Sequence, residues 1–304
     1  MIVTELYNGS GLGNQLFNYV TTRVIALDNN YDFGIMNSFK FKGQDFMNLD
    51  FGKEVIGGYS PQEGAPPITL PNGILNYYRE KEVRYNGIDI RDYDVELTKI
   101  PDNTKLDGLM QSDKYFSHRK EEIKKWLKVK DEHQCYEYCS DDICVINLRG
   151  GEYTCFPELY LTRKYWDDGI EHMRRINPNM KFVVITDDVL SAQNMFVKPL
   201  YPDFEIQHFN IAKDYSIINN ARYLLLSNSS FSYFAAYTSN ECKYIIAPKY
   251  WARHNVSDGY WACAFNIYSD WNWLGRDSKL YSSDECKKEL DEYMINIKDR
   301  CVYK

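Results

Sequence analysis

The chain has 304 residues, of which 44% are hydrophobic and 26% are charged, and its formal net charge is −7. This length allows two domains with separate cores, and the acidic balance argues against a general nucleic-acid binder, which carries a basic face. No apolar run approaches the length needed to span a bilayer, and the N-terminus lacks the pattern of a secretion signal. These features predict a cytoplasmic protein with at most peripheral contact with the inner face of a membrane.

Tyrosine and cysteine are the two residue types whose abundance needs an explanation. The 26 Tyr supply most of the 15% aromatic content, and they suit sugar surfaces as well as core packing, with packing the favoured interpretation. The eight Cys form no C-x-x-C pair, so we expect reduced and mostly buried thiols. His133, Cys135 and Cys139 lack the spacing of a zinc site, and no metal is expected.

The first half of the chain predicts a strand, a glycine-rich loop and a helix in that order. Residues 1–7 are an apolar run, Gly9, Gly11 and Gly13 alternate after it, and the apolar residues from Leu16 to Leu27 then fall on one helical face. Strands are expected at 33–35 and 106–111, with a helix near 121–127. Because residues 128–142 are polar and without period, we place a domain boundary at 135/136.

The second half alternates apolar runs with helical patterns, which is typical of a parallel sheet covered by helices. Strands are expected at 143–148, 181–186, 205–209, 223–227 and 244–247. Helices are expected after Thr162, after Asp188, over 214–221 and from about residue 230. Residues 250–282 show no clear period. A last helix near 284–297 closes the domain 136–304 and is expected to pack back on the domain 1–135.

Polar clusters follow three of these strands, and ligands in open parallel sheets bind beyond the carboxyl ends of the strands. In residues 147–152, Arg149 could bind a phosphate and Glu152 could act as a base, although a surface Arg–Glu pair is equally common. The carboxylates of Asp187 and Asp188 could bind a guanine edge or ribose hydroxyls, or cap the next helix. Residues 227–232 place small hydroxyl side chains at a helix start, as an anion site or an ordinary cap.

The glycine stretch must be weighed against the dinucleotide fingerprint G-x-G-x-x-G. Here the spacing is Gly9-x-Gly11-x-Gly13, which differs at the last glycine, and Asp28 and Asp32 are weak candidates for a ribose ligand. A nicotinamide oxidoreductase is therefore a minor alternative. No Walker loop is present.

Several ordered motifs resemble glycosyltransferase family 11, the α-1,2-fucosyltransferases. The stretch 11–19 is similar to the family's G-G-L-G-N-Q-L-F-Q-Y, residues 111–116 to Q-S-E-K-Y-F, 185–188 to F-S-D-D, and 228–232 to N-S-S-F-S. The resemblance implies a GT-B fold, in which two Rossmann-like domains with parallel sheets face each other across a cleft. It also implies inverting, metal-independent transfer of L-fucose from GDP-β-L-fucose to a galactose 2-hydroxyl of a glycan.

The same resemblance implies roles for individual residues. Arg149 would neutralise the departing β-phosphate, and Glu152 remains a candidate base. Residues that would bind the donor are Gly11, Gly13, Asn14 and Gln15 near the transferred sugar, Asn147 beside the nucleotide, Asp187 or Asp188 at guanine, and Ser229, Ser230 and Phe231 at the phosphates.

One segment departs from the family pattern. Where the family has H-x-R-R-x-D, this chain has Asn147-Leu148-Arg149-Gly150-Gly151-Glu152, so an imidazole and a second guanidinium are missing. Two alternatives follow from this change: a transferase for another GDP-sugar, or a relative that binds a glycan or nucleotide without turnover.

Overall fold

The computed structural model describes residues 1–55, 73–85, 88–91, 93–259, 261, 267–297 and 302–303. The chain forms two compact units, the first comprising residues 1–128 and 300–304 and the second residues 129–299. The division lies at 128/129, before the 135/136 boundary taken from sequence. The connecting residues join the second unit because the Cys135 amide donates to Ser216 Oγ at 2.8 Å and Asn220 Nδ2 donates to Gln134 Oε1 at 2.8 Å.

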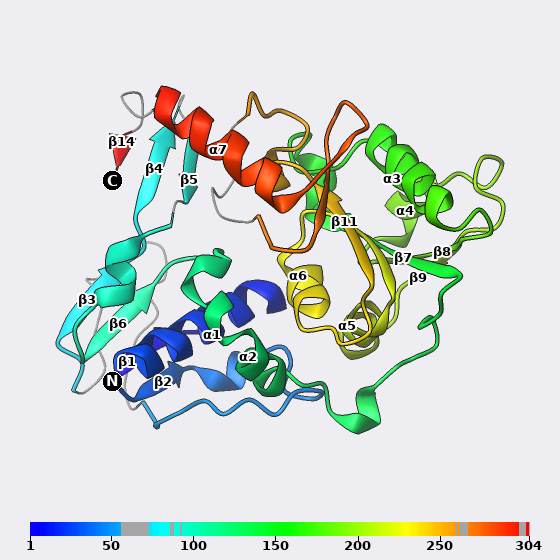
Figure 1. Ribbon diagram of the computed structural model, residues 1–304. Helices are drawn as coiled ribbons and strands as arrows, with labels where there is room; N and C mark the ends of the chain where they lie inside the picture. Colours follow the sequence, from blue (N-terminus) through cyan, green and yellow to red (C-terminus); the bar gives the residue numbers. More distant parts are fainter. Residues whose placement is uncertain are drawn as a thin grey trace. The chain divides into compact units, whose positions relative to one another are not determined.

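The first unit is built on a parallel sheet of order β2-β1-β6-β3, and β14-β4-β5 form a separate antiparallel sheet. Its elements, shown in Figure 1, are β1 (Ile2–Glu5), α1 (Leu12–Asp28), β2 (Phe33–Met36), β3 (Asn76–Arg79), β4 (Glu82–Tyr85), β5 (Ile88–Arg91), β6 (Thr104–Asp107), α2 (Lys120–Trp126) and β14 (Val302–Tyr303). Residues 56–72, which include the prolines at 61, 66, 67 and 71, lie outside the described residues.

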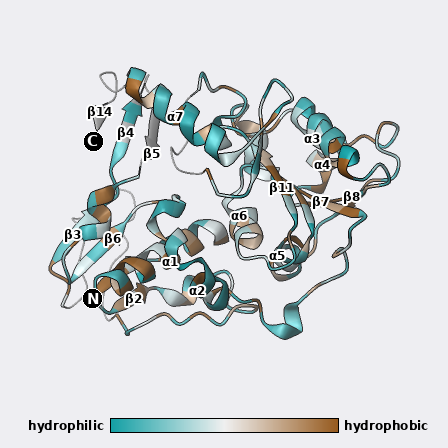
Figure 2. Cartoon of the chain, in the orientation of Figure 1, coloured by the Kyte–Doolittle hydropathy of each residue, from teal (hydrophilic) through white to brown (hydrophobic). Residues whose placement is uncertain are grey.

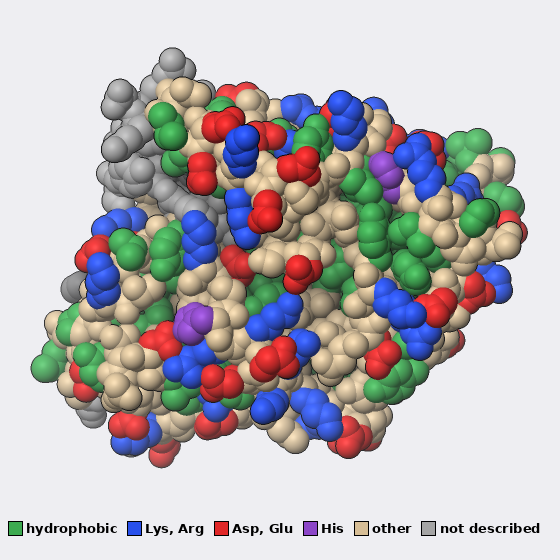
Figure 3. All heavy atoms as spheres, viewed as in Figure 1, with side chains coloured by type: hydrophobic (Ala, Val, Ile, Leu, Met, Phe, Trp, Pro, Cys, Tyr) green, Lys and Arg blue, Asp and Glu red, His purple; other side chains and the backbone are tan. Residues whose placement is uncertain are grey.

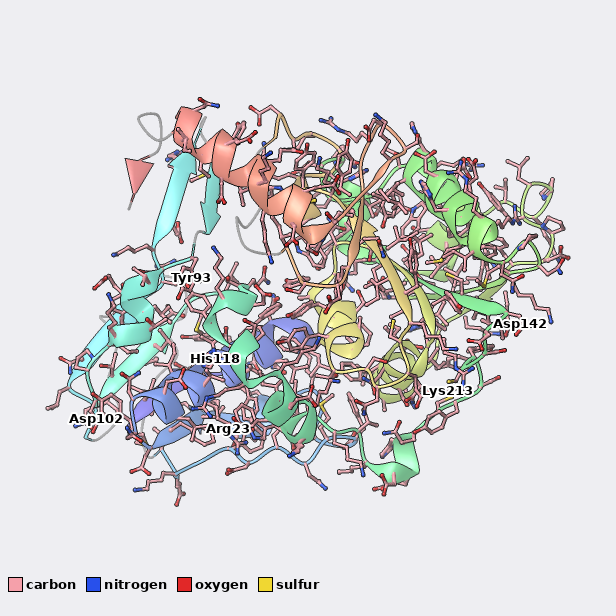
Figure 4. All side chains as sticks on the ribbon, viewed as in Figure 1. Arg23, Tyr93, Asp102, His118, Asp142 and Lys213 are labelled. Carbon is pink, nitrogen blue, oxygen red and sulfur yellow. The ribbon has the colours of Figure 1, made fainter. Side chains whose placement is uncertain are left out.

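Helix α1 is buried along most of its length against β1 and β2. Arg23 of α1, which is labelled in Figure 4, has its Cζ 4.1 Å from the ring centroid of Trp126 in α2. In the sheet, Lys105 Nζ of β6 donates to Glu5 Oε2 of β1 at 2.6 Å, and both side chains are fully buried. Asn37 Nδ2 also donates to Glu5 Oε1 at 2.8 Å, so this buried charge is well bonded.

The second unit is a sheet of order β13-β12-β11-β10-β7-β8-β9, parallel except at β13. Its elements are β7 (Ile143–Leu148), α3 (Arg163–Ile176), β8 (Lys181–Thr186), α4 (Val189–Met195), β9 (Glu205–Gln207), α5 (Ile211–Asn220), β10 (Tyr223–Leu226), α6 (Ser230–Tyr237), β11 (Tyr244–Pro248), β12 (Asn272–Leu274), β13 (Leu280–Tyr281) and α7 (Ser283–Ile297). Two parallel sheets in an α/β chain confirm the predicted fold class. Helix α7, expected to pack back on the first domain, groups with the second unit.

Both faces of the larger sheet are covered by helices, with α3 and α4 on one side and α5 and α6 on the other (Figure 1). Alternate residues of the strands, such as Ile146, Val184 and Leu225, pack against Tyr165 and Ile170 of α3 in one core. The strands are coloured as hydrophobic in Figure 2, whereas α3 is largely hydrophilic. Strands buried on both faces explain why these runs were predictable from sequence.

The aromatic segment after β11 is core rather than surface. Tyr268 lies 3.9 Å from Tyr233 of α6, centroid to centroid, and Trp271 and Trp273 pack beside it. All four side chains are at most 5% exposed. The packing interpretation of the aromatic content therefore holds for this cluster.

The six described cysteines are free thiols, of which Cys144 and Cys286 are buried and Cys155 is exposed. The expectation of mostly buried thiols is therefore wrong for these positions. Cys263 and Cys301 lie outside the described residues.

Candidate functional site

Arg149 directly follows the carboxyl-terminal end of β7, and its side chain lies between two acidic side chains. One of its terminal nitrogens donates to Asp187 Oδ2, and the other donates to Glu152 Oε1 at 2.9 Å. Its Cζ lies 5.4 Å from the ring centroid of Tyr153. The Arg149 side chain is 32% exposed, so it is held in position and still open to an incoming anion.

Asp187 and Asp188 follow β8, whose Thr186 pairs with Leu148 of β7. Asp187 Oδ1 accepts from the Gly150 amide at 2.8 Å, and Asp188 Oδ2 accepts from the Gly151 amide at 3.2 Å. Asp188 also caps α4, because its Oδ1 accepts from the Ser191 amide at 3.0 Å. These bonds lower the pKa of Asp188 below its usual value, with the Ser191 hydroxyl as the largest cause.

The two carboxylates therefore hold the loop after β7 before any ligand arrives. The cap interpretation applies to Asp188. The guanine-reading prediction for Asp187 or Asp188 stays a prediction, and it would require a base to replace one of these bonds.

Glycine is required at two positions of this loop. A Cβ on Gly150 would lie 2.6 Å from Asp188 Cβ, and one on Gly151, whose φ is +49°, would lie 3.0 Å from Asp187 Oδ2. The position of the family's second arginine is thus packed against the β8 turn. The glycine at position 150 carries no side chain, and this allows the backbone there to lie close to Asp188.

Asn147, in the place of the family's histidine, is 6% exposed and bonded on both sides. Its Nδ2 donates to the Ile185 carbonyl at 3.4 Å, and its Oδ1 accepts from Ser227 Oγ at 3.2 Å. The side chain joins β7 to the ends of β8 and β10. It positions the site, and its predicted contact with the nucleotide stays a prediction.

Helix α6 begins directly after β10 with Ser229 as its N-cap residue, and the Ser229 side chain does not cap it. The amides of Ser230 and Phe231 in the first turn are therefore without a side-chain cap, and the helix dipole favours an anion there. Tyr153 OH donates to the Asn228 carbonyl at 3.5 Å. This contact joins the start of α6 to the loop that carries Arg149.

The predicted residues of the second unit are thus brought together at one edge of the larger sheet, at the ends of β7, β8 and β10. A guanidinium and an uncapped helix start are groups that bind phosphate.

The predicted residues of the first unit lie at the carboxyl end of β1. Gly11 is the N-cap residue of α1, without a side-chain cap, and Gly13 is buried in the first turn. Gln15 is 1% exposed, and its amide group bonds the Lys40 carbonyl and the Lys42 amide, each at 2.9 Å. Its side chain therefore has a structural role in holding residues 40–42.

Asn14 is partly exposed, and its Oδ1 accepts from Gln111 Nε2 at 2.8 Å. The contact joins the glycine stretch to the segment 111–116, two motifs that are far apart in sequence. Gln111 was not predicted as a site residue, although its motif was the signal that could have found it.

Two further residues near the Arg149 edge were missed. Tyr153 contacts Arg149, and its only sequence signal was its place beside Glu152. Asp214, at the start of α5, accepts from the Phe209 amide at 3.1 Å and contacts His208 Nδ1 at 3.1 Å. Burial is the largest cause of its raised pKa, and Asp187 contributes.

Within the described ranges, no group of His, Cys, Asp and Glu side chains could hold a metal ion. None of the helices described combines the length and apolarity needed to cross a bilayer. On the face shown in Figure 3, basic and acidic side chains are interspersed.

The family model of Glycosyl transferase family 11 matches residues 71–275, more than half of the 304 residues. The chain belongs to this family and is a glycosyltransferase, as the motifs predicted. The match contains the Arg149 edge and Gln111, but it begins after the glycine stretch. The roles of all the predicted site residues, in both units, stay predictions.

Individual relatives are distant. The chain is 21% identical over 278 residues to the alpha-1,2-colitosyltransferase of Escherichia coli, covering 83% of this chain and 93% of that protein. The structure of fucosyltransferase NodZ from Bradyrhizobium is 13% identical with a TM-score of 0.46, covering 81% of this chain and 94% of NodZ. A mutant of Arabidopsis thaliana FUT1 in complex with GDP is 10% identical with a TM-score of 0.44, covering 81% and 69% of the two chains.

Proposed function

We propose that this glycosyltransferase moves L-fucose from GDP-β-L-fucose to a galactose-type hydroxyl of a glycan, in α-1,2 linkage and with inversion. The acceptor oxygen forms a bond to C1 of fucose while the bond from C1 to the β-phosphate oxygen breaks. The electron pair of that bond stays on GDP, and the acceptor proton passes to Glu152 or to water. Family membership supports the donor class.

The observation that supports the proposal is that Tyr153 contacts both the Arg149 guanidinium and the Asn228 carbonyl, which precedes the start of α6. The guanidinium would bind the β-phosphate as charge develops on the leaving group, and the amides of Ser230 and Phe231 would bind the phosphates with the Ser229 hydroxyl. These groups supply the positive charge that a divalent cation supplies in other transferases. We therefore expect transfer to continue in the presence of EDTA.

A second candidate donor is GDP-colitose, whose sugar is L-fucose without the 3-hydroxyl. One observation favours it: the Escherichia coli relative carries the name of a colitosyltransferase. A site built to bond a substrate hydroxyl rejects the analogue that lacks it, so the two donors can be told apart by their kinetics.

The deciding experiment compares kcat/KM for GDP-fucose and GDP-colitose with methyl β-D-galactoside as acceptor. A preference of about 10³-fold or more for GDP-fucose would indicate that the 3-hydroxyl is bonded in the transition state. A preference for GDP-colitose would overturn the fucose assignment. Absence of both transfer and donor hydrolysis would favour the non-catalytic alternative, and NMR of the product anomer tests inversion.

A further inference from the structure

A second pocket lies at the carboxyl edge of the larger sheet and shares no residue with the Arg149 edge. Its walls come from the start of α3, from the segment after β11 and from the turn after β12. Its cavity volume is about 140 Å³, smaller than the sites that enclose drug-sized ligands, so it suits a single small unit.

His254 is one of the residues that line this pocket. The side chain is 3% exposed, and its Nδ1 lies 3.0 Å from the Lys249 carbonyl. Because a carbonyl only accepts, Nδ1 carries the proton and Nε2 keeps a lone pair. Among the described residues, no donor contacts Nε2. Burial lowers the pKa of His254 to about 4, so the ring is neutral at pH 7.

The other walls carry both donors and acceptors. Lys164 Nζ donates to Asp168 Oδ2 at 2.6 Å, and the Asp168 carboxylate is only 16% exposed. Arg276 is exposed, and it donates to the Asn255 carbonyl at 3.1 Å. Thr162 is the N-cap residue of α3, but its hydroxyl does not cap the helix.

This set of groups distinguishes between ligand classes. A simple anion would leave the His254 lone pair unsatisfied, and a cation would meet Lys164 and Arg276. Sugar hydroxyls donate and accept at the same time, so they can bond His254 and Asp168 while accepting from the two cations.

We propose that the pocket formed by Thr162, Lys164, Asp168, His254, Gly275 and Arg276 binds a pyranose unit, separate from the donor sugar. Its assignment to a remote unit of the acceptor glycan rests on the proposed transfer to a glycan. Binding of a sugar at this pocket does not depend on which donor the enzyme uses.

Saturation-transfer NMR on the full chain tests this proposal with three probes: methyl β-D-galactopyranoside, N-acetyl-D-glucosamine and D-glucuronate. We expect at least one to bind, and to bind about tenfold or more weakly to Asp168→Asn and to Arg276→Ala. Arg175→Ala is the matched control, because Arg175 is exposed at the other end of α3. His254→Gln, whose amide keeps an acceptor, should weaken binding less than His254→Phe.

The proposal is overturned if no probe binds, if binding is unchanged in Asp168→Asn and Arg276→Ala, or if Arg175→Ala weakens it equally. Circular dichroism of each variant separates lost binding from lost folding. Calorimetric titration of GDP into the wild-type chain tests the proposed donor site by itself. If the chain binds GDP but no sugar probe, the proposed function stands and the sugar-site proposal fails. If the chain binds a sugar probe but no GDP, the sugar-site proposal stands and the proposed donor site fails.

Discussion

Arg149 donates a hydrogen bond to the carboxylate of Asp187, a residue 38 positions further along the chain. The same carboxylate accepts from the amide of Gly150, so one acidic side chain fixes both the cation and the turn that follows it. The pair brings the ends of β7 and β8 into one site.

Replacing Arg149 by Ala should lower kcat/KM for sugar transfer by about 100- to 1,000-fold, since the charge that develops on the leaving phosphate loses its partner. Steady-state kinetics with the natural donor measures the effect. Arg175→Ala, which removes an exposed arginine of α3, is the matched control and should keep normal kinetics. Normal turnover in Arg149→Ala would remove the phosphate role from this residue.

Replacing Glu152 by Gln separates two roles of this carboxylate. The Glu152 carboxylate accepts from Arg149. If its one role is to compete with the donor diphosphate for this guanidinium, the variant should have a lower KM for the donor and an unchanged kcat. A base should instead give a lower kcat and lose the acidic limb of the pH profile. Unchanged kcat, KM and pH profile would exclude both roles.

Replacing Gly150 by Ala should destabilise the second unit by about 1–3 kcal/mol, because the new Cβ would lie 2.6 Å from Asp188 Cβ. Gly11→Ala is the matched control: no atom lies within 4 Å of its added Cβ, and its φ of −67° suits any residue. Thermal unfolding compares the two variants. An equally stable Gly150→Ala would contradict the close approach described here.

Replacing Gln15 by Ala should destabilise the first unit by about 1–3 kcal/mol, because the side chain is buried and its two partly buried hydrogen bonds to the Lys40 carbonyl and the Lys42 amide are lost. Asn14→Ala loses a contact at the partly exposed Gln111 and should cost below about 1 kcal/mol. Urea unfolding of both variants tests this order. If Asn14→Ala proves the more damaging, the structural role belongs to Asn14.

His254 should make the protein less stable in mild acid. Its pKa is lowered to about 4, so the unfolded chain takes up a proton near pH 6.5 while the folded chain does not. The contribution is complete above pH 6.5 and falls by about 3 kcal/mol as the pH drops to 4.

The comparison of wild type with His254→Gln isolates this contribution, since carboxyl groups titrate in both proteins. We expect the difference in unfolding free energy between them to depend on pH over this window. His118→Gln, at a half-exposed histidine, is the control. A difference that stays constant from pH 4 to 7 would show that His254 takes up its proton equally in both states.

Much of the second unit was predictable because local pattern and final environment agree. Strands such as β7 and β8 are buried on both faces, so continuous apolar runs mark them in the sequence. The helices between them carry apolar residues on one face, and the polar clusters at the strand ends were expected to meet because parallel strands end at one edge. The motifs then indicated the family.

Other elements had no local signal. Strand β3 contains Asn76 and Arg79 and exists because it pairs with β6, and β12 has only three residues. Strands β4, β5 and β13 were missed for the same reason. A short strand is stabilised by its neighbours in the sheet, and its own side chains carry little of that information.

The sequence by itself determined the α/β class, the alternation of strands and helices from β7 to β11, the family and the strand ends that carry polar groups. Only the tertiary structure decided how those groups are used. In the folded chain Arg149 pairs with Asp187, and Asp188 caps α4. Gln15 bonds the backbone at residues 40 and 42. His254 lines a pocket, and among the described residues no donor contacts its Nε2. The physical reason is that periodicity records burial, whereas a hydrogen-bond partner depends on which distant segments the sheet register brings together.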